Sequence, residues 1–222
     1  MALAPVKEAG GARTGDLLLA CVTEHGSASH DYPSSDDLLK GSYASRNLSD
    51  VVHFLCTLHG RYPGVIDHAA NRSVEPAIRA WFTSALDGFG AERAFLAKLA
   101  VAAGPLPSTP GAGDNDAVLR AQRHAIEMLA QSERSGCALG AALALVSDWG
   151  TIRRVLNAAA TKFGVEIPNY RLNDTAAVFS IAESIDSAPF SRALLFGAQQ
   201  IALQHRGLWD LLEARQQARG IY

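Results

Sequence analysis

The sequence predicts an all-α fold, a single-domain multi-helix bundle. Apolar residues recur at spacings of three and four rather than two, which is typical of helices with one buried face. Alanine and leucine dominate, and no run rich in Val, Ile and Thr marks a strand. The 222 residues, 48% of them hydrophobic, suffice for one substantial core. We expect one helical domain over residues 15–222, preceded by a flexible N-terminal tail at residues 1–14.

The periodicity predicts nine helices, and capping residues support several of their ends. Asn47 and Asp50 resemble an N-cap pair, Pro63 and Pro76 suit first helical turns, and Gly164 suits a helix end. Segments 105–114 and 165–173 are the clearest loops, and neither is long enough to separate two domains. The predicted helices are, in order, residues 16–25, 48–59, 63–71, 76–86, 91–103, 115–134, 136–163, 175–185 and 190–219.

Composition excludes several classes of function. The net charge is −2, and the 20 Lys and Arg residues form no basic stripe, so we expect no nucleic-acid partner. The longest uncharged apolar run, residues 137–146, is far shorter than the roughly 20 residues needed to span a bilayer, so we expect no membrane partner. The three cysteines are far apart, which indicates reduced, buried thiols and a cytoplasmic protein. The oligomeric state is left open.

The segment SGCALGAALALVSDW, residues 135–149, is apolar almost all round, which predicts a central buried helix. Gly136, Gly140 and Ala144 would let a neighbouring helix or a flat ligand approach the backbone, and we favour helix packing. Cys137 stands at the head of this helix, where the helix dipole favours a thiolate nucleophile. Burial as a small apolar residue is the preferred interpretation of this cysteine.

Helical-wheel positions then separate outward from inward polar residues. His124 and Glu127 spell HxxE, the pattern of di-iron carboxylate sites, but they lie opposite the expected apolar stripe. We therefore expect a solvated face on which Arg123 and Glu127 pair at i,i+4. The expected stripe consists of Val118, Ala125 and Leu129. The same argument turns three more residues outward: Asp50, His53 and His68.

Four ionisable residues instead fall on inner faces of four different helices: His59, Glu92, Asp148 and His205. Buried charged groups are costly unless they are paired or bind a metal. Two histidines and two carboxylates suit a non-haem iron or manganese centre, or a zinc site, so these residues are our candidate metal ligands. In that scheme the metal activates dioxygen beside a pocket for a small apolar ligand.

Each of the four also has a structural alternative. Glu92 can complement a helix N-terminus, and His59 can complement a C-terminus before Gly60. Asp148 can cap a second helix that begins after a break near Gly150. His205 can be a core histidine bonded to a backbone carbonyl.

Three segments carry a family resemblance. The stretch ALGAALALVSDWGTIRRVL, residues 138–156, is similar to the distal-helix region of bacterial haem oxygenases of the type associated with bacteriophytochromes. YASRNLSDVVHFLCTLHGRYPGVIDHAA, residues 43–70, resembles their second and third helices, and FSRALLFGAQQIALQHRGLWDLL, residues 190–212, resembles their final helix. The chain is also similar to helical proteins of alphaproteobacteria, a likeness that implies no function.

The resemblance implies a haem-oxygenase-like fold, in a superfamily that also includes thiaminase-related enzymes and di-iron oxidases. It implies that His25 stands nearest to the haem-ligating histidine and that Gly150 stands where that family has a glycine-rich helix break. Our first hypothesis is therefore a haem-oxygenase-like protein, a metal-dependent oxidoreductase. The alternatives are a non-catalytic helical module that binds a small ligand or a partner protein, and a haem-binding protein that does not cleave haem.

Overall fold

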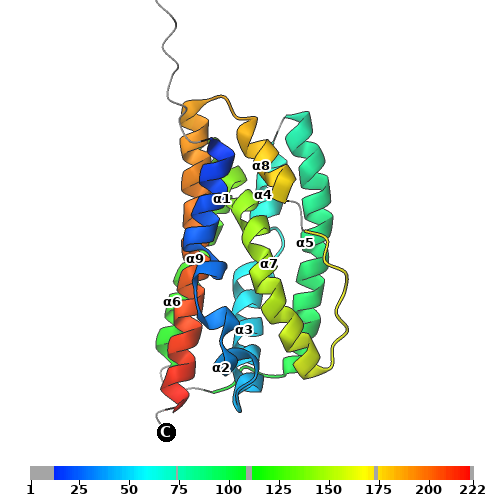
Figure 1. Ribbon diagram of the computed structural model, residues 1–222, viewed down its shortest axis with the longest axis vertical. Helices are drawn as coiled ribbons and strands as arrows, with labels where there is room; N and C mark the ends of the chain where they lie inside the picture. Colours follow the sequence, from blue (N-terminus) through cyan, green and yellow to red (C-terminus); the bar gives the residue numbers. More distant parts are fainter. Residues whose placement is uncertain (1–12, 74, 109–111, 173–174, 221–222) are drawn as a thin grey trace, which may run out of the picture.

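A computed structural model describes residues 13–73, 75–108, 112–172 and 175–220. The described residues form helices and connecting loops and include no strand, which confirms the all-α prediction. The long helices run roughly parallel to one axis of an elongated bundle (Figure 1). Eleven helical segments follow one another along the described chain: α1 Thr14–His25, η1 Ser27–Ser29, η2 Tyr32–Ser34, α2 Asp36–Leu39, α3 Ala44–His59, α4 Val65–Arg72, α5 Pro76–Ala103, α6 Ala112–Ala130, α7 Cys137–Phe163, α8 Thr175–Glu183 and α9 Ala188–Gly220.

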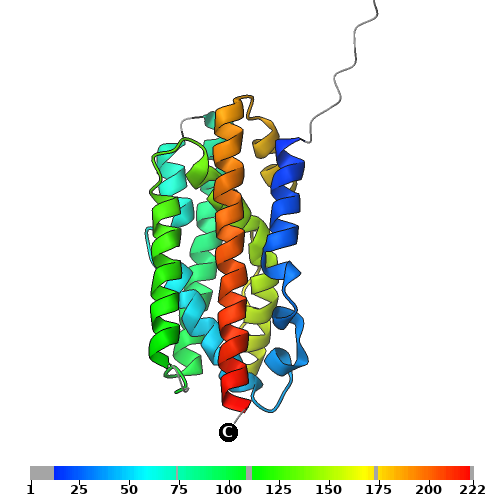
Figure 2. The ribbon, with the colours of Figure 1, turned by 90° about the vertical axis from the view of Figure 1, so that its left-hand side faces the viewer.

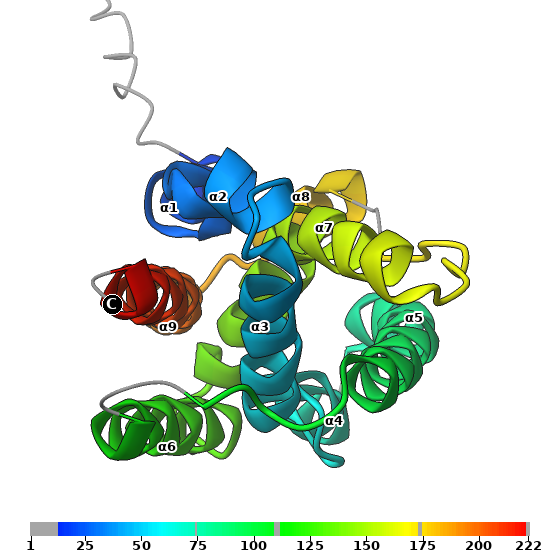
Figure 3. The same ribbon diagram turned by 90° about the horizontal axis from the view of Figure 1, so that it is seen from below.

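Helix α7 is the central element, as its apolar sequence predicts. Its first ten residues are all buried, and it contacts α1, α3, α4, α5, α6, α8 and α9. Its largest interface is with α9, which crosses one side of the bundle between α1 and α6 (Figure 2). Seen from below, α3 also lies inside the ring of surrounding helices (Figure 3). The buried apolar side chains of these elements form one cluster.

Glycines bring α7 and α9 unusually close. A Cβ atom on Gly140 would lie 1.8 Å from the carbonyl oxygen of Leu194, and one on Gly197 would lie 2.0 Å from the carbonyl oxygen of Cys137. Such distances leave no room for any side chain, so both positions require glycine. The expectation of close helix packing at Gly140 is confirmed, and Cys137 is buried within this interface.

Several predicted boundaries are wrong for identifiable reasons. Segments 76–86 and 91–103 are one continuous helix, because two glycines cost only about 1 kcal/mol each in a helix, and packing outweighs that cost. Leu172 packs against Gly88, where a Cβ atom would lie 2.8 Å from its side chain. Helix α7 likewise runs through Gly150 without a break, so Asp148 does not cap a second helix.

The region before α3 also differs from expectation. Helix α3 begins at Ala44, so Asn47 and Asp50 lie inside it and do not cap it. The three short helices from Ser27 to Leu39 were not anticipated. Helix α4 begins at Val65, after Pro63, and α6 ends at Ala130. The expected tail at 1–14 lies outside the described residues up to residue 12, and Thr14 already belongs to α1.

No helix in the described ranges combines the length and apolarity that crossing a bilayer demands.

Candidate functional site

Three of the four inward residues form a hydrogen-bonded chain inside the bundle. His205 Nδ1 lies 2.6 Å from Asp148 Oδ2, and His205 Nε2 lies 3.0 Å from His59 Nε2. The three side chains come from α9, α7 and α3, and their exposed fractions are 0% for His205, 3% for Asp148 and 5% for His59. The α7–α9 contact described above sets the register that brings Asp148 to His205.

The segment after α1 completes the binding of the Asp148 carboxylate. The backbone N–H of Ser27 donates to Asp148 Oδ1 at 2.8 Å, and the Ser27 hydroxyl donates to Oδ2 at 2.6 Å. A Cβ atom on Gly26 would lie 2.6 Å from Asp148 Oδ1, so this approach requires glycine at that position. Asp148 therefore accepts three hydrogen bonds and is held in one orientation.

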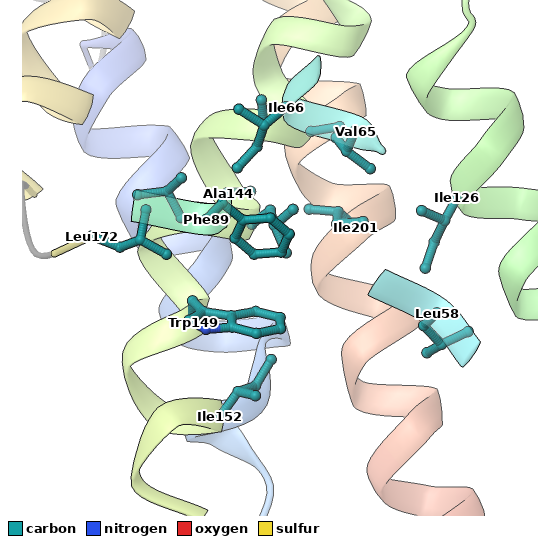
Figure 4. Close-up of a cluster of buried hydrophobic side chains, with 14 of the residues drawn as sticks. Leu58, Val65, Ile66, Phe89, Ile126, Ala144, Trp149, Ile152, Leu172 and Ile201 are labelled. Atoms are coloured by element: carbon teal, nitrogen blue, oxygen red, sulfur yellow. The ribbon is translucent and has the colours of Figure 1, made fainter. Parts of the chain in front are cut away.

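At the other end of the chain, His59 lies among aromatic rings. The ring of Trp149 meets its edge at a centroid distance of 5.5 Å, and Phe89 does so at 6.5 Å. Figure 4 shows Phe89 and Trp149 next to each other, and their ring centroids are 4.8 Å apart. Burial, together with the neighbouring His205, holds the pKa of His59 well below its usual value. His59 is therefore a neutral imidazole at physiological pH.

Hydrogen-bonding rules restrict the protonation of this chain. When both rings are neutral and Asp148 is ionised, His205 donates through Nδ1 and accepts through Nε2, so His59 donates through Nε2. The Nδ1 atom of His59 is then an unprotonated acceptor. Among the described residues, no protein group forms a hydrogen bond with that atom. One additional proton entering at Nδ1 reverses the His59–His205 bond and leaves the positive charge on His205 beside Asp148.

His59 also lines a cavity of about 290 Å³. Its apolar walls come from α3, α4, α5, α6 and α7, and Figure 4 shows four of the side chains, Leu58, Val65, Phe89 and Ile126. Ala130 and Leu145 also belong to the apolar lining. A buried imidazole with one free nitrogen thus borders a mostly apolar space, which is the usual composition of a small-molecule site.

The wall formed by residues 61–64 is fixed by a buried ion pair. Arg93 donates to both carboxylate oxygens of Asp67, at 2.7 and 3.2 Å, and Asp67 accepts the backbone N–H of Gly64 at 2.8 Å. The guanidinium of Arg93 also lies over the rings of Tyr62 and Phe89, at 5.5 and 5.3 Å from their centroids. The cavity wall is therefore preorganised.

Glu92 is the one candidate ligand that the structure does not bring to the histidines. It accepts a hydrogen bond from Trp149 Nε1 at 3.0 Å and forms a buried ion pair with Arg153. Burial raises the pKa of Glu92, and these two contacts oppose that shift. Because α5 is continuous, Glu92 does not complement a helix N-terminus either. Its role is to orient Trp149, whose ring packs on His59.

The expected metal site is therefore not formed by these four residues. The described part of the chain contains no group of three or more His, Cys, Asp or Glu side chains placed to hold a metal ion. His205 engages both ring nitrogens with protein partners, and the carboxylate of Glu92 faces a guanidinium. The structure gives these side chains partners within the protein in place of a shared metal.

His25 is the last residue of α1 and is half-buried. It is not among the residues that line the His59 cavity or a larger cavity of about 700 Å³ between α4, the start of α7 and the segment 184–187. The glycine-rich helix break of the haem oxygenases has no counterpart, because α7 is unbroken at Gly150. The structure thus does not connect His25 with the Asp148–His205–His59 chain.

The residues of α6 that we expected to face solvent lie only partly where helical periodicity placed them. His124 is exposed and Arg123 pairs with Glu127 at 3.4 Å, as expected. Of the stripe expected on α6, Leu129 is buried as predicted, but Val118 is 47% exposed and Ala125 is only half-buried. Leu119 and Ile126 are buried in their place, and Arg123 and Glu127 lie at the cavity mouth.

The three other residues expected to face outward are all at least half-buried. His68 also lines the cavity, and His53 is half-buried beside the carbonyl oxygen of Gly104 at 2.8 Å. Asp50 is buried and forms ion pairs with Arg215 and Arg219, so its outward placement was wrong.

Sequence reasoning missed Ser27, Arg153 and Arg215. Ser27 follows Gly26 in a stretch without helical periodicity, so only the three-dimensional contact reveals its role. Arg153 and Arg215 are buried beside carboxylates of other helices. Their inner helical positions were the available signal, because a buried arginine requires an acidic partner.

Comparisons with known proteins add a family but no activity. No curated protein and no solved structure matches this sequence significantly. A family model described as a family of unknown function (DUF6975) matches residues 22–220, a span that contains Ser27, His59, Asp148 and His205. With most of its length matched, the chain belongs to the DUF6975 family.

Proposed function

We propose that this protein binds a small molecule in the His59 cavity and removes a proton from it. The observation that carries this proposal is the buried chain from His59 at the cavity, through His205, to the Asp148 carboxylate. A positioned histidine that is neutral at the working pH is the commonest general base in enzymes.

Each residue of the hydrogen-bonded chain has its own role in the proton transfer. His59 Nδ1 accepts the proton from the bound molecule, and the proton on His59 Nε2 passes to His205 Nε2 over the 3.0 Å contact. His205 becomes the cation and is stabilised by the Asp148 carboxylate at 2.6 Å. The low pKa of His59 agrees with this scheme, because the scheme never leaves the positive charge on His59.

The surroundings support the same chemistry. Ser27 fixes the carboxylate through two hydrogen bonds, and Trp149 and Phe89 fix the His59 ring from the side. The hydrocarbon side chains of the lining offer no hydrogen-bond partners to water that would compete for His59 Nδ1. A fixed base in an apolar space requires little reorganisation when it takes up a proton.

Deuterium exchange tests the proposal directly. The protein is incubated in D₂O with a panel of small ketones and 2-oxo acids, and loss of C–H signals is followed by ¹H NMR. We expect exchange with at least one compound, abolished in His59→Gln, which retains a polar partner for His205 but has no base. His53→Gln, on the same helix, is the matched control and retains exchange. Exchange that is equal in His59→Gln and the wild type contradicts the proposal.

The haem-oxygenase-like fold and haem binding at His25 stay predictions. An absorption spectrum of the protein mixed with haem tests them, because ligation by His25 predicts a Soret band that His25→Ala removes. The proton-transfer proposal does not depend on that result, since His25 is not among the residues that line the His59 cavity.

A further inference from the structure

The mouth of the His59 cavity carries more positive than negative charge. Among the lining residues, Arg61 and Arg123 are cationic and Glu127 is anionic, so with neutral histidines the lining has a formal charge of +1. The whole chain has a formal charge of −2. The cavity is thus locally positive on an acidic protein, which favours an anionic ligand.

Arg123 has hydrogen-bonding capacity to spare. Its only ionic partner in the described structure is Glu127, with Nε and Oε1 3.4 Å apart. The Arg123 Nε–H is enclosed and forms no hydrogen bond, and no hydrogen bond from its terminal nitrogens occurs among the described residues. The side chain is 29% exposed, so its two terminal nitrogens can donate to a ligand at the mouth of the cavity. Arginine binds carboxylates through two parallel hydrogen bonds.

The volume and the apolar lining of the cavity interior limit the size and polarity of the rest of the ligand. A volume of about 290 Å³ corresponds to roughly ten non-hydrogen atoms if each occupies the ~30 Å³ of a liquid water. The side chains of Leu58, Val65, Phe89, Ile126 and Leu145 in the lining are hydrocarbon. The neutral His59 at the inner end offers no charge to bind an anion, so the anionic group belongs at the mouth.

We propose that the ligand of the His59 cavity is a small monocarboxylate whose carboxylate pairs with Arg123 and Arg61, and whose apolar body reaches toward His59. A single negative charge matches the formal charge of +1 on the lining better than a phosphate dianion does. This inference rests on the proposed function, because it names the substrate class for the same cavity.

Binding of matched probes tests the inference. Benzoate and benzamide have the same shape and differ in charge, and each has nine non-hydrogen atoms. Both are titrated into ¹⁵N-histidine-labelled protein, and the shift of the His59 ring signals gives each Kd. The same titrations are repeated with Arg123→Gln and with Arg120→Gln, a matched control on an exposed position of the same helix.

We expect benzoate to bind at least fivefold more tightly than benzamide. Arg123→Gln should weaken benzoate about tenfold and change benzamide less than twofold, whereas Arg120→Gln should change neither. Ala130→Leu, which fills part of the cavity, should weaken both probes. Phenyl phosphate should bind no more tightly than benzoate.

The outcomes separate the two proposals. Equal affinity for benzamide and benzoate, or an Arg123→Gln variant that binds benzoate normally, overturns the carboxylate inference and leaves the His59 site intact. Tighter binding of phenyl phosphate overturns the choice of a carboxylate. If neither probe shifts the His59 signals, the cavity does not admit ligands of this size and the proposed function itself is wrong.

Discussion

Replacing Asp148 with asparagine removes the negative charge at one end of the Asp148–His205–His59 hydrogen-bonded chain and keeps the shape of the side chain. Asp148 accepts hydrogen bonds from the Ser27 N–H, the Ser27 hydroxyl and His205 Nδ1. In Asp148→Asn, the oxygen can still accept the Ser27 N–H, but the amide nitrogen takes the place of Oδ2 and donates. His205 must then accept through Nδ1 and donate through Nε2, and His59 must accept through Nε2. The substitution therefore moves a proton onto His59 Nδ1.

The expected loss of stability follows from the bonds that change. Three hydrogen bonds to a charged group become neutral bonds, and the difference is about 1 kcal/mol each at most. Relief from burying a charge offsets part of this loss, so we expect Asp148→Asn to destabilise the protein by ~2 kcal/mol. Asp148→Ala leaves the three donors unpaired and should cost ~4 kcal/mol or more. Urea unfolding at pH 7.5, with the free energy obtained from midpoint and slope, measures both values.

The effect on proton transfer should be much larger than the effect on stability. In the serine-protease triad, the equivalent Asp→Asn change lowers kcat by roughly 10⁴ because the histidine adopts the wrong tautomer. Folded Asp148→Asn should therefore lose deuterium exchange at least a hundredfold. If Asp148→Asn costs as much stability as Asp148→Ala, the two rings do not change tautomer. If folded Asp148→Asn exchanges deuterium at the wild-type rate, the chain has no part in the reaction.

Three further outcomes are expected. Gly140→Ala should destabilise the protein by about 3 kcal/mol, because the new Cβ meets the Leu194 carbonyl. Gly150→Ala should stabilise it by up to ~1 kcal/mol, because no atom lies nearer than 4.0 Å to the new Cβ. Thermal unfolding compares the two variants. Arg153→Met should cost about 3–5 kcal/mol in urea by leaving Glu92 buried without its cation, and adding Glu92→Gln should restore part of the loss. Because folding lowers the pKa of His59, the unfolded chain binds one more proton than the folded protein below pH ~6.5. The free energy of unfolding should therefore fall by up to ~1.4 kcal/mol per pH unit in that range. His59→Gln should show a shallower slope, and an unchanged slope would contradict the lowered pKa of His59.

The sequence predicted the interior of the bundle better than its ends. Helix α7 was recognisable because it is apolar all round, and the inward positions of His59, Asp148 and His205 followed from helical periodicity alone. The register within a helix was less certain where polar and apolar residues mix. On α6, Leu119 and Ile126 are buried where Val118 and Ala125 were expected, which hid the approach of Arg123 to the cavity.

What the sequence could not predict depends on contacts between distant segments. Ser27 and Asp148 are 121 residues apart, and Glu92 and Arg153 are 61 apart. An inward carboxylate can be satisfied by a metal, a histidine, an arginine or a serine, and helical position does not distinguish them. The sequence therefore identified which groups are buried, and the structure identified their partners.

The most direct test of the Asp148–His205–His59 relay is ¹⁵N NMR of the histidine rings across a pH titration, with His59→Gln and His205→Gln used for assignment. At high pH we predict a bare Nδ1 and a protonated Nε2 on His59, and a protonated Nδ1 on His205. As the pH falls through the usual range of histidine, His59 should form no imidazolium, because burial and the neighbouring His205 hold its pKa well below the usual value. A proton on His59 Nδ1 at high pH, or an imidazolium on His59 in the usual pH range of histidine, would contradict the relay.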